Sequence, residues 1–175
     1  AIIGQLITVN LIYFIFNFKF NLILENLIIL CGILSNLYLI YINKNTQLSD
    51  KAAFLFLSID ILQLSCLVYL TGGIANPFSI FLIIPTIFSS SNLGFKSNFL
   101  LVVITIFIII FLTFFNYPLP YPVNEHFHVD GYYYYSIPIS LIIALIFLNY
   151  FALTFGKESR IRKEALNKME EIMSK

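Results

Sequence analysis

The sequence predicts an all-α, polytopic membrane protein, a bundle of six transmembrane helices followed by a cytosolic helix. Of its 175 residues, 59% are hydrophobic and only 11% are charged, and the mean hydropathy is +0.90. Too little polar sequence remains to cover the exterior of a soluble domain, so lipid is the expected solvent. Two further observations support this class: regularly spaced polar breaks, and lysine and arginine gathered on one side of the resulting arrangement.

The number of spans follows from the length of hydrocarbon that a helix must cross. About 20 apolar residues cross roughly 30 Å of hydrocarbon. A short turn at Lys19 and Asn21, the polar stretch 43–51, the turn 72–78 and the polar loop 116–131 interrupt the apolar sequence. The expected spans cover about residues 1–16, 22–42, 52–70, 77–90, 98–115 and 132–155.

The sixth span is expected to continue as a helix beyond the membrane. Residues 157–175 are charged and lack turn formers, so the chain divides into a transmembrane domain, 1–156, and the start of a cytosolic helix. Ile161, Leu166 and Met169 recur at helical spacing without keeping one strict heptad. This pattern fits a dimeric signalling helix or, alternatively, a basic juxtamembrane helix.

The distribution of positive charge predicts the orientation. With the N-terminus inside, Lys19 alone faces outward, and the cytoplasmic side receives Lys44, Lys51, Lys96, Lys157, Arg160, Arg162, Lys163, Lys168 and Lys175. This asymmetry obeys the positive-inside rule. Both ends of the chain are therefore expected in the cytoplasm, and the turn at 72–78 faces the opposite side.

Composition also excludes several functions. A net charge of +1 without a clustered basic face argues against binding nucleic acid. Cys31 and Cys66 lie inside apolar runs, where we expect packing residues rather than a disulfide or a metal pair. His126 and His128 form a weak metal motif in a polar loop, and solvated side chains explain them better. No metal site is predicted.

The densest turn chemistry of the chain lies at Gly72-Gly73-Ile-Ala-Asn76-Pro77-Phe78. The two glycines end one helix and permit backbone conformations closed to other residues. Proline at a first helical position loses no needed donor, and a preceding asparagine caps free N–H groups. The sequence therefore predicts a helix end, a glycine turn and a capped helix start at one membrane surface.

Such a turn has two interpretations. N–H groups at a helix start favour partial negative charge, so they suit the carbonyl oxygens of a quinone. Tyr69, Phe78 and Phe81 would supply aromatic surface for its flat ring. A well-made interfacial turn between two helices explains the same residues without a ligand.

Polar residues within the spans form a second group of candidates. Asp60 is expected near the middle of the third span, with Gln63 one turn away on the same face. An ionisable group at this depth either couples quinone occupancy to helix packing, handles a proton, or forms a buried polar contact that holds helices together. Asn10 and Asn36 are expected to hold helices together by hydrogen bonds.

The heptapeptide also carries a resemblance. Its fixed positions match GGxxNPF of the RegB/PrrB family of redox-sensing histidine kinases through Gly72, Gly73, Asn76, Pro77 and Phe78. The run Asp60-Ile-Leu-Gln63-Leu, Pro85, and Pro118-Leu-Pro120-Tyr-Pro122 resemble that family's third span, fourth span and last outer loop. Agreement extends over roughly residues 50–163.

The resemblance implies a homodimeric sensor kinase of the bacterial inner membrane that contacts lipid and signals to a response regulator. It further implies that a ubiquinone-like quinone is sensed at Gly72, Gly73, Asn76, Pro77 and Phe78, with the oxidised form lowering autophosphorylation. ATP and magnesium would belong to a kinase domain, whose phosphoacceptor and ATP-binding segments are absent from these 175 residues. These residues hold no catalytic group, no counterpart of the family's redox-active cysteine and no tryptophan.

Two other classes remain as alternatives. One is a quinone-binding membrane subunit of a respiratory enzyme, which would copurify with a redox partner. The other is a small transporter, which is expected to show paired broken helices or inverted repeats. Because the chain starts at Ala1 within apolar sequence, we expect a piece of a longer protein, and the codons after Lys175 would separate these classes.

Overall fold

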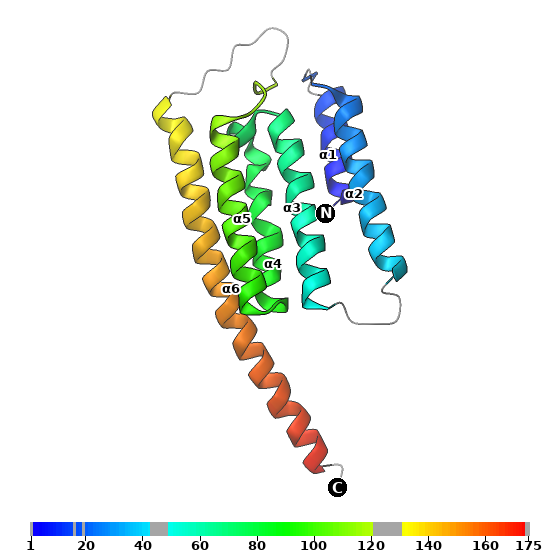
Figure 1. Ribbon diagram of the computed structural model, residues 1–175, viewed down its shortest axis with the longest axis vertical. Helices are drawn as coiled ribbons and strands as arrows, with labels where there is room; N and C mark the ends of the chain where they lie inside the picture. The colour runs from blue at the N-terminus through cyan, green and yellow to red at the C-terminus, as the bar shows by residue number, and fades with distance from the viewer. Residues whose placement is uncertain (1, 16, 19, 43–48, 121–130, 174–175) are drawn as a thin grey trace.

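The computed structural model describes residues 2–15, 17–18, 20–42, 49–120 and 131–173. Every regular element in these ranges is helical, which confirms the all-α class. The elements, in order, are α1 (Ile2–Ile15), α2 (Leu22–Ile42), α3 (Asp50–Leu70), the 3₁₀ helices η1 (Gly73–Ala75) and η2 (Pro77–Ile83), α4 (Ile84–Asn92), α5 (Phe95–Phe114) and α6 (Gly131–Met173). They run up and down side by side, as Figure 1 shows.

Four helices in the described residues are long and apolar enough to cross a membrane. They are α2, α3, α5 and the first part of α6, Gly131–Glu158. Their length and composition are those of an integral membrane protein. The remaining apolar helices, Ile2–Ile15 and Pro77–Ser90, are shorter, so the count of six spans stays a prediction.

The segment expected as the fourth span has two helical forms. It begins at Pro77, as predicted, but its first seven residues form a 3₁₀ helix and only Ile84–Asn92 is α-helical. Proline at the start has no N–H to donate, and Pro85 interrupts the backbone ladder again one residue into α4. The hydroxyls of Thr86, Ser89 and Ser90 each donate to a carbonyl three residues earlier.

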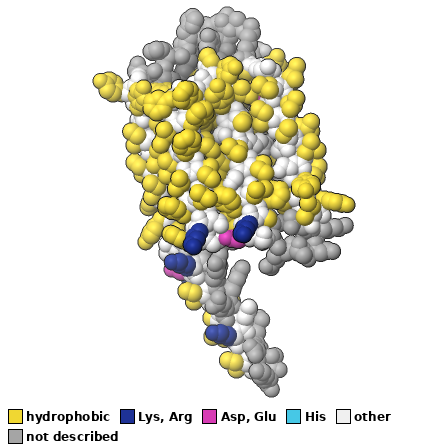
Figure 2. All heavy atoms as spheres, in the orientation of Figure 1, with side chains coloured by type: hydrophobic (Ala, Val, Ile, Leu, Met, Phe, Trp, Pro, Cys, Tyr) yellow, Lys and Arg dark blue, Asp and Glu magenta, His cyan; other side chains and the backbone are white. Residues whose placement is uncertain are grey.

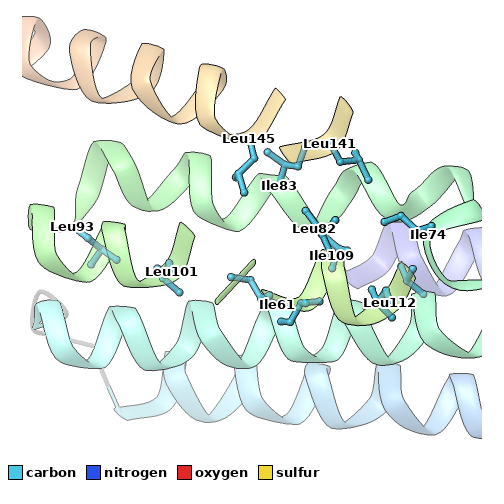
Figure 3. Close-up of a cluster of buried hydrophobic side chains, with 12 residues drawn as sticks. Ile61, Ile74, Leu82, Ile83, Leu93, Leu101, Ile109, Leu112, Leu141 and Leu145 are labelled. Carbon is cyan, nitrogen blue, oxygen red and sulfur yellow. The ribbon is translucent and has the colours of Figure 1, made fainter. Parts of the chain in front are cut away.

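A single apolar core joins α3, α4 with its preceding 3₁₀ turns, α5 and α6. Its fully buried members, drawn in Figure 3, include Ile61 of α3, Leu82 of η2, Ile109 of α5 and Leu145 of α6. Their small exposed fractions contrast with the outward side chains of the same helices, such as Phe107 at 69%. Apolar residues thus face both inward and outward, which is the pattern of a bundle solvated by lipid.

The first two helices form a hairpin at the edge of this bundle (Figure 1). α1 packs chiefly against α2, and α2 packs against α3. No residue of α1 is buried, and α2 buries only Glu25, Ile29 and Gly32. The hairpin therefore buries fewer side chains against the rest of the protein than the core helices do.

Polar contacts inside the bundle also fix α4, α5 and α6 to one another. The amide of Asn98 donates to the Asn149 carbonyl oxygen (3.0 Å), and the Asn149 amide donates to the Thr86 carbonyl (3.2 Å). The Ser89 hydroxyl, whose one proton is shared between the Thr86 carbonyl and Asn98 Oδ1, lies 2.5 Å from the latter oxygen. All four side chains are buried, so each bond forms where water cannot replace it.

The end of the bundle that holds the start of α3 also carries charged residues. The Asp50 carboxylate accepts from the Gly94 N–H and the Ser97 hydroxyl, both at 2.9 Å, so the starts of α3 and α5 are tied together there. An anionic group at two helix N-termini is electrostatically favourable. Lysine and arginine side chains gather at the same end of the apolar surface (Figure 2).

The predicted extension of the sixth span as a helix is confirmed. α6 continues without interruption through Gly156 to Met173 and projects beyond the other helices (Figure 1). Ile161, Leu166 and Met169 are exposed along this projecting part.

Replacing Asn149 with alanine should lower stability. The substitution leaves the buried Asn98 amide without its partner on α6, at a cost of about 1–3 kcal/mol. Thermal unfolding of the protein in detergent, followed by circular dichroism, measures the change. Asn10→Ala is the control, because it removes one contact between the peripheral helices, worth about 0.6 kcal/mol. Equal stability of Asn149→Ala and the wild type would contradict this assignment.

Candidate functional site

The two glycines of the heptapeptide lie in the left-handed backbone region. Gly72 has a φ of 107° and Gly73 a φ of 58°, so the chain turns where α3 ends. Both are buried beneath the segment that follows α5. A Cβ at Gly72 would lie 2.8 Å from Leu119 Cα, and one at Gly73 would lie 2.8 Å from Asn116 Nδ2. Both conformation and space therefore require glycine.

Asn76 holds the turn together with its side chain. Its Oδ1 accepts from the Phe78 N–H at 2.8 Å, which is the predicted helix cap. Its Nδ2 donates to the Thr71 hydroxyl (2.6 Å) and carbonyl (3.2 Å). Since Asn76 is buried and both ends of its amide are paired, it shapes the site and has little capacity left for a ligand.

The turn contacts α6 through Asn116. The Asn116 amide, packed against Gly73, donates to the Tyr134 hydroxyl at 2.9 Å. That hydroxyl donates in turn to the Thr113 carbonyl at 2.8 Å. A continuous set of contacts therefore leads from the heptapeptide to the first turn of α6, four residues before Pro138.

A cavity of about 1160 Å³ lies on the other side of the turn. Its walls come from α1, α2, α3, η2, the start of α4 and the segment after α5. Most lining residues are apolar, such as Ile12, Leu67 and Phe81. Ligand pockets are usually about 300–1,000 Å³ and mostly apolar with a few placed polar groups, so this cavity has the size and chemistry for an amphiphilic ligand.

The cavity brings together most of the residues singled out in the sequence. Asp60, Gln63, Asn76, Pro77 and Phe78 all line it. The Phe78 and Phe81 rings stack with centroids 5.8 Å apart and present a flat aromatic surface. The two groups of candidates, which the sequence analysis treated separately, thus share one cavity.

Three other predicted residues lie outside the cavity wall. Gly72 and Gly73 support the turn from behind, against the segment after α5. The Tyr69 ring faces Phe111 and Tyr117 instead, with centroids 6.4 and 5.5 Å away. Tyr69 therefore packs against other aromatic rings and does not provide aromatic surface to the cavity, as Phe78 and Phe81 do.

Polar side chains line the cavity at successive depths along α3. The Gln63 amide donates to Gln5 of α1 at 3.1 Å, and Gly32 leaves room for it against α2. Deeper, the Asn36 amide of α2 lies 3.5 Å from Asp60 Oδ1. Asp60 lies ten residues before the end of α3, about 15 Å into the helix. The expected hydrogen bonding of Asn36 between helices is confirmed.

The sequence interpretation missed Glu25. This residue lies in the first turn of α2, lines the cavity and is 1% exposed. Neither carboxylate oxygen has a hydrogen-bond partner among the described residues. The available signal was an acidic residue near the start of an otherwise apolar span, an unusual position that invites a functional explanation.

The described residues contain no group of three or more histidine, cysteine or acidic side chains able to hold a metal. His126 and His128 lie outside the described residues. Cys31 and Cys66 are free and exposed on α2 and α3, outside the buried core.

Comparison with known proteins found one curated relative. The sensor histidine kinase RegB of Cereibacter sphaeroides is 28% identical over 123 residues, which is 70% of this chain. The chain is RegB-like. The match confirms the resemblance drawn from the heptapeptide and supports a membrane domain of the RegB sensor-kinase type. It covers 27% of RegB, so this chain corresponds to about a quarter of the relative's length.

Two further comparisons gave no match. No family model matches the chain, and no solved structure does. The relation to RegB therefore depends on sequence, and the cavity described above comes from this chain's own structure.

Replacing Gly72 with alanine should destabilise the turn. A left-handed conformation costs a non-glycine residue about 1–2 kcal/mol, and overlap with the Leu119 backbone adds to that. The midpoint of thermal unfolding in detergent should fall. Gly4→Ala in α1 is the matched control, because its Cβ meets open space and should leave the midpoint equal or higher. A Gly72→Ala protein as stable as the wild type would refute this account.

Proposed function

We propose that this chain is the membrane sensor module of a two-component histidine kinase and that its cavity binds a quinone. The observation that carries the proposal is the cavity of about 1160 Å³, which is lined by Asn76, Pro77 and Phe78 of the heptapeptide together with Asp60 and Gln63. The similarity to RegB supports the kinase connection. These two observations are independent of each other, since the cavity comes from the geometry of the structure and the similarity to RegB comes from the sequence.

The head group of the quinone lies against the stacked Phe78 and Phe81 rings. A flat aromatic platform matches a planar ring, and offset stacking contributes about 0.5–1.5 kcal/mol beyond the area buried. The apolar tail follows the wall formed by α1 and α3, where Ile12, Leu64 and Leu67 lie. Asn76 holds the Phe78 backbone in place. It forms no strong hydrogen bond with the ligand, because both ends of its amide are already paired.

Redox sensing then depends on the difference in hydrogen bonding between the two ligand forms. A quinone offers carbonyl acceptors, whereas a quinol offers hydroxyl donors. A difference in their affinity for two packings of the helices shifts the populations of those packings. Asp60 and Gln63 couple occupancy of the cavity to the contacts of α3 with α1 and α2, because both side chains hydrogen bond across those helices.

The signal passes from the turn to α6 through Asn116 and Tyr134. Displacement of Gly73 moves the Asn116 amide, which donates to the Tyr134 hydroxyl. Pro138 lacks the N–H that would bond the Tyr134 carbonyl, so α6 is easier to bend at this level. The projecting end of α6 carries the change toward the kinase.

The proposed topology has six membrane crossings, with α1 and the segment from η2 through α4 as the two short ones. Both ends lie in the cytoplasm, and the heptapeptide lies at the periplasmic side of a bacterial inner membrane. The gathering of positive side chains near the starts of α3 and α5 supports this orientation. ATP, magnesium and the response regulator would meet the kinase part of the parent protein.

A photoreactive short-chain ubiquinone analogue should label the walls of the cavity in nanodiscs. Phe78→Ala should weaken its binding about tenfold, because an aromatic contact of about 1.4 kcal/mol is lost. Phe107→Ala is the matched control, since that ring is exposed on α5 and does not line the cavity. Equilibrium titration measures the affinity. Labelling confined to α5 and α6, with unchanged affinity of Phe78→Ala, would exclude the proposed site.

A homodimer is part of the proposal, and the projecting part of α6 supplies its contact. Leu166, Met169 and Met173 are exposed, spaced three and four residues apart and so lie on one helix face. With Cys31 and Cys66 replaced by alanine, Met169→Cys should form a crosslinked dimer under mild oxidation. Asn167→Cys, on the opposite face, should crosslink poorly.

The same crosslink reports transmission from the cavity. Adding the ubiquinone analogue should change the crosslinking rate of Met169→Cys, and adding Tyr134→Phe or Asp60→Asn should diminish that change. Gel electrophoresis of timed samples measures the rate. Equal crosslinking at Met169 and Asn167 would argue against the dimer, and an undiminished ligand effect in both variants would argue against this route.

A further inference from the structure

Glu25 is a buried carboxyl group to which no described residue donates a hydrogen bond. It is 1% exposed, and both oxygens lack a partner among the described residues. Buried polar groups in folded proteins are almost always paired, since an unpaired one costs about 1–3 kcal/mol. Glu25 also lines the cavity. A partner from outside the protein is therefore expected at this point of the cavity wall.

Helix capping does not explain Glu25. Although it lies in the first turn of α2, where negative charge is favourable, Asn21 already serves the first N–H groups. The Leu24 N–H donates to Asn21 Oδ1 (3.2 Å), and the Glu25 N–H donates to the Asn21 carbonyl (3.1 Å). The carboxyl group is therefore not used to cap α2.

Its neighbours do not neutralise it either. The one ion pair in the described residues joins Arg162 to Glu158 in the projecting part of α6, far along the chain. Two polar pairs of the hairpin and α3 hydrogen bond within themselves: Asn10 donates to Asn26, and Gln63 donates to Gln5. Within the described residues, no side chain therefore pairs with the Glu25 carboxyl group.

The position suits the head group of a membrane amphiphile. Glu25 lies three residues after the start of α2, about 4.5 Å along the helix. The α1–α2 connection and the heptapeptide lie at the same end of the bundle (Figure 1). A polar head group bound near Phe78 is therefore at the depth of Glu25, with apolar walls available for its tail.

We propose that Glu25 accepts a hydrogen bond from a hydroxyl of the reduced head group, so that the cavity prefers a quinol to a quinone. This inference rests on the proposed function. A hydroxyl both donates and accepts, and it pairs with a carboxyl group in either protonation state. A quinone carbonyl only accepts, so it pairs with the protonated carboxyl alone. Glu25 thereby becomes the residue that distinguishes the two forms.

Equilibrium binding of a short-chain ubiquinol and the matching ubiquinone, to the protein in nanodiscs under anaerobic conditions, tests the assignment. Glu25→Gln should weaken ubiquinol binding about tenfold, because the glutamine oxygen is an uncharged and weaker acceptor for the quinol hydroxyl than a carboxylate. Ubiquinone binding should not weaken, since a carboxylate has no donor to lose and glutamine supplies an N–H group. Glu158→Gln, in the projecting part of α6, is the control and should change neither affinity.

A second measurement uses a conservative variant that keeps the carboxyl group. The reduced-minus-oxidised infrared difference spectrum of the wild type with bound ligand should contain a carboxyl band that shifts in Glu25→Asp. Equal effects of Glu25→Gln on both forms, or none on either, would overturn the inference and leave the quinone site standing. A wild type that binds neither form would overturn the proposed function together with this inference.

Discussion

The fold around the site depends on the buried amide of Asn76. Its Nδ2 is bonded to Thr71 at the end of α3, and its Oδ1 is bonded to the Phe78 N–H at the start of η2. One side chain thus fixes the angle between two helices in a place where water cannot substitute for it. The left-handed glycines before it and the aromatic platform after it both take their positions from these bonds.

The parts of this structure that depend on local chemistry were predictable from the sequence. Asn76 and Pro77 marked a capped helix start, and the charged stretch after Gly156 continued α6, because caps and helix propensity act within a few residues. The cavity was not predictable. It arises where the α1–α2 hairpin leaves the core, and Glu25, Gln5 and Leu119 meet there from distant parts of the chain. Periodicity likewise gave no sign that Tyr69 packs away from it.

The structure divides the molecule into a firmly packed bundle and a looser hairpin. The buried core and the Asn98–Asn149 contacts hold α3 to α6 together, whereas α1 packs chiefly on α2. The cavity lies along this division, so the hairpin is the wall that can move with least loss of packing. A ligand that contacts both the hairpin and the bundle would shift the hairpin more easily than it would rearrange the packing of the core.

The 3₁₀ helix at Pro77–Ile83 has a consequence for membrane thickness. A 3₁₀ helix rises about 2.0 Å per residue, compared with about 1.5 Å for an α-helix. The segment from Pro77 to Asn92 therefore extends about 28 Å, where an α-helix of the same residues would extend about 24 Å. Stretching the backbone allows a short apolar segment to approach the roughly 30 Å of hydrocarbon that its longer neighbours cross as α-helices.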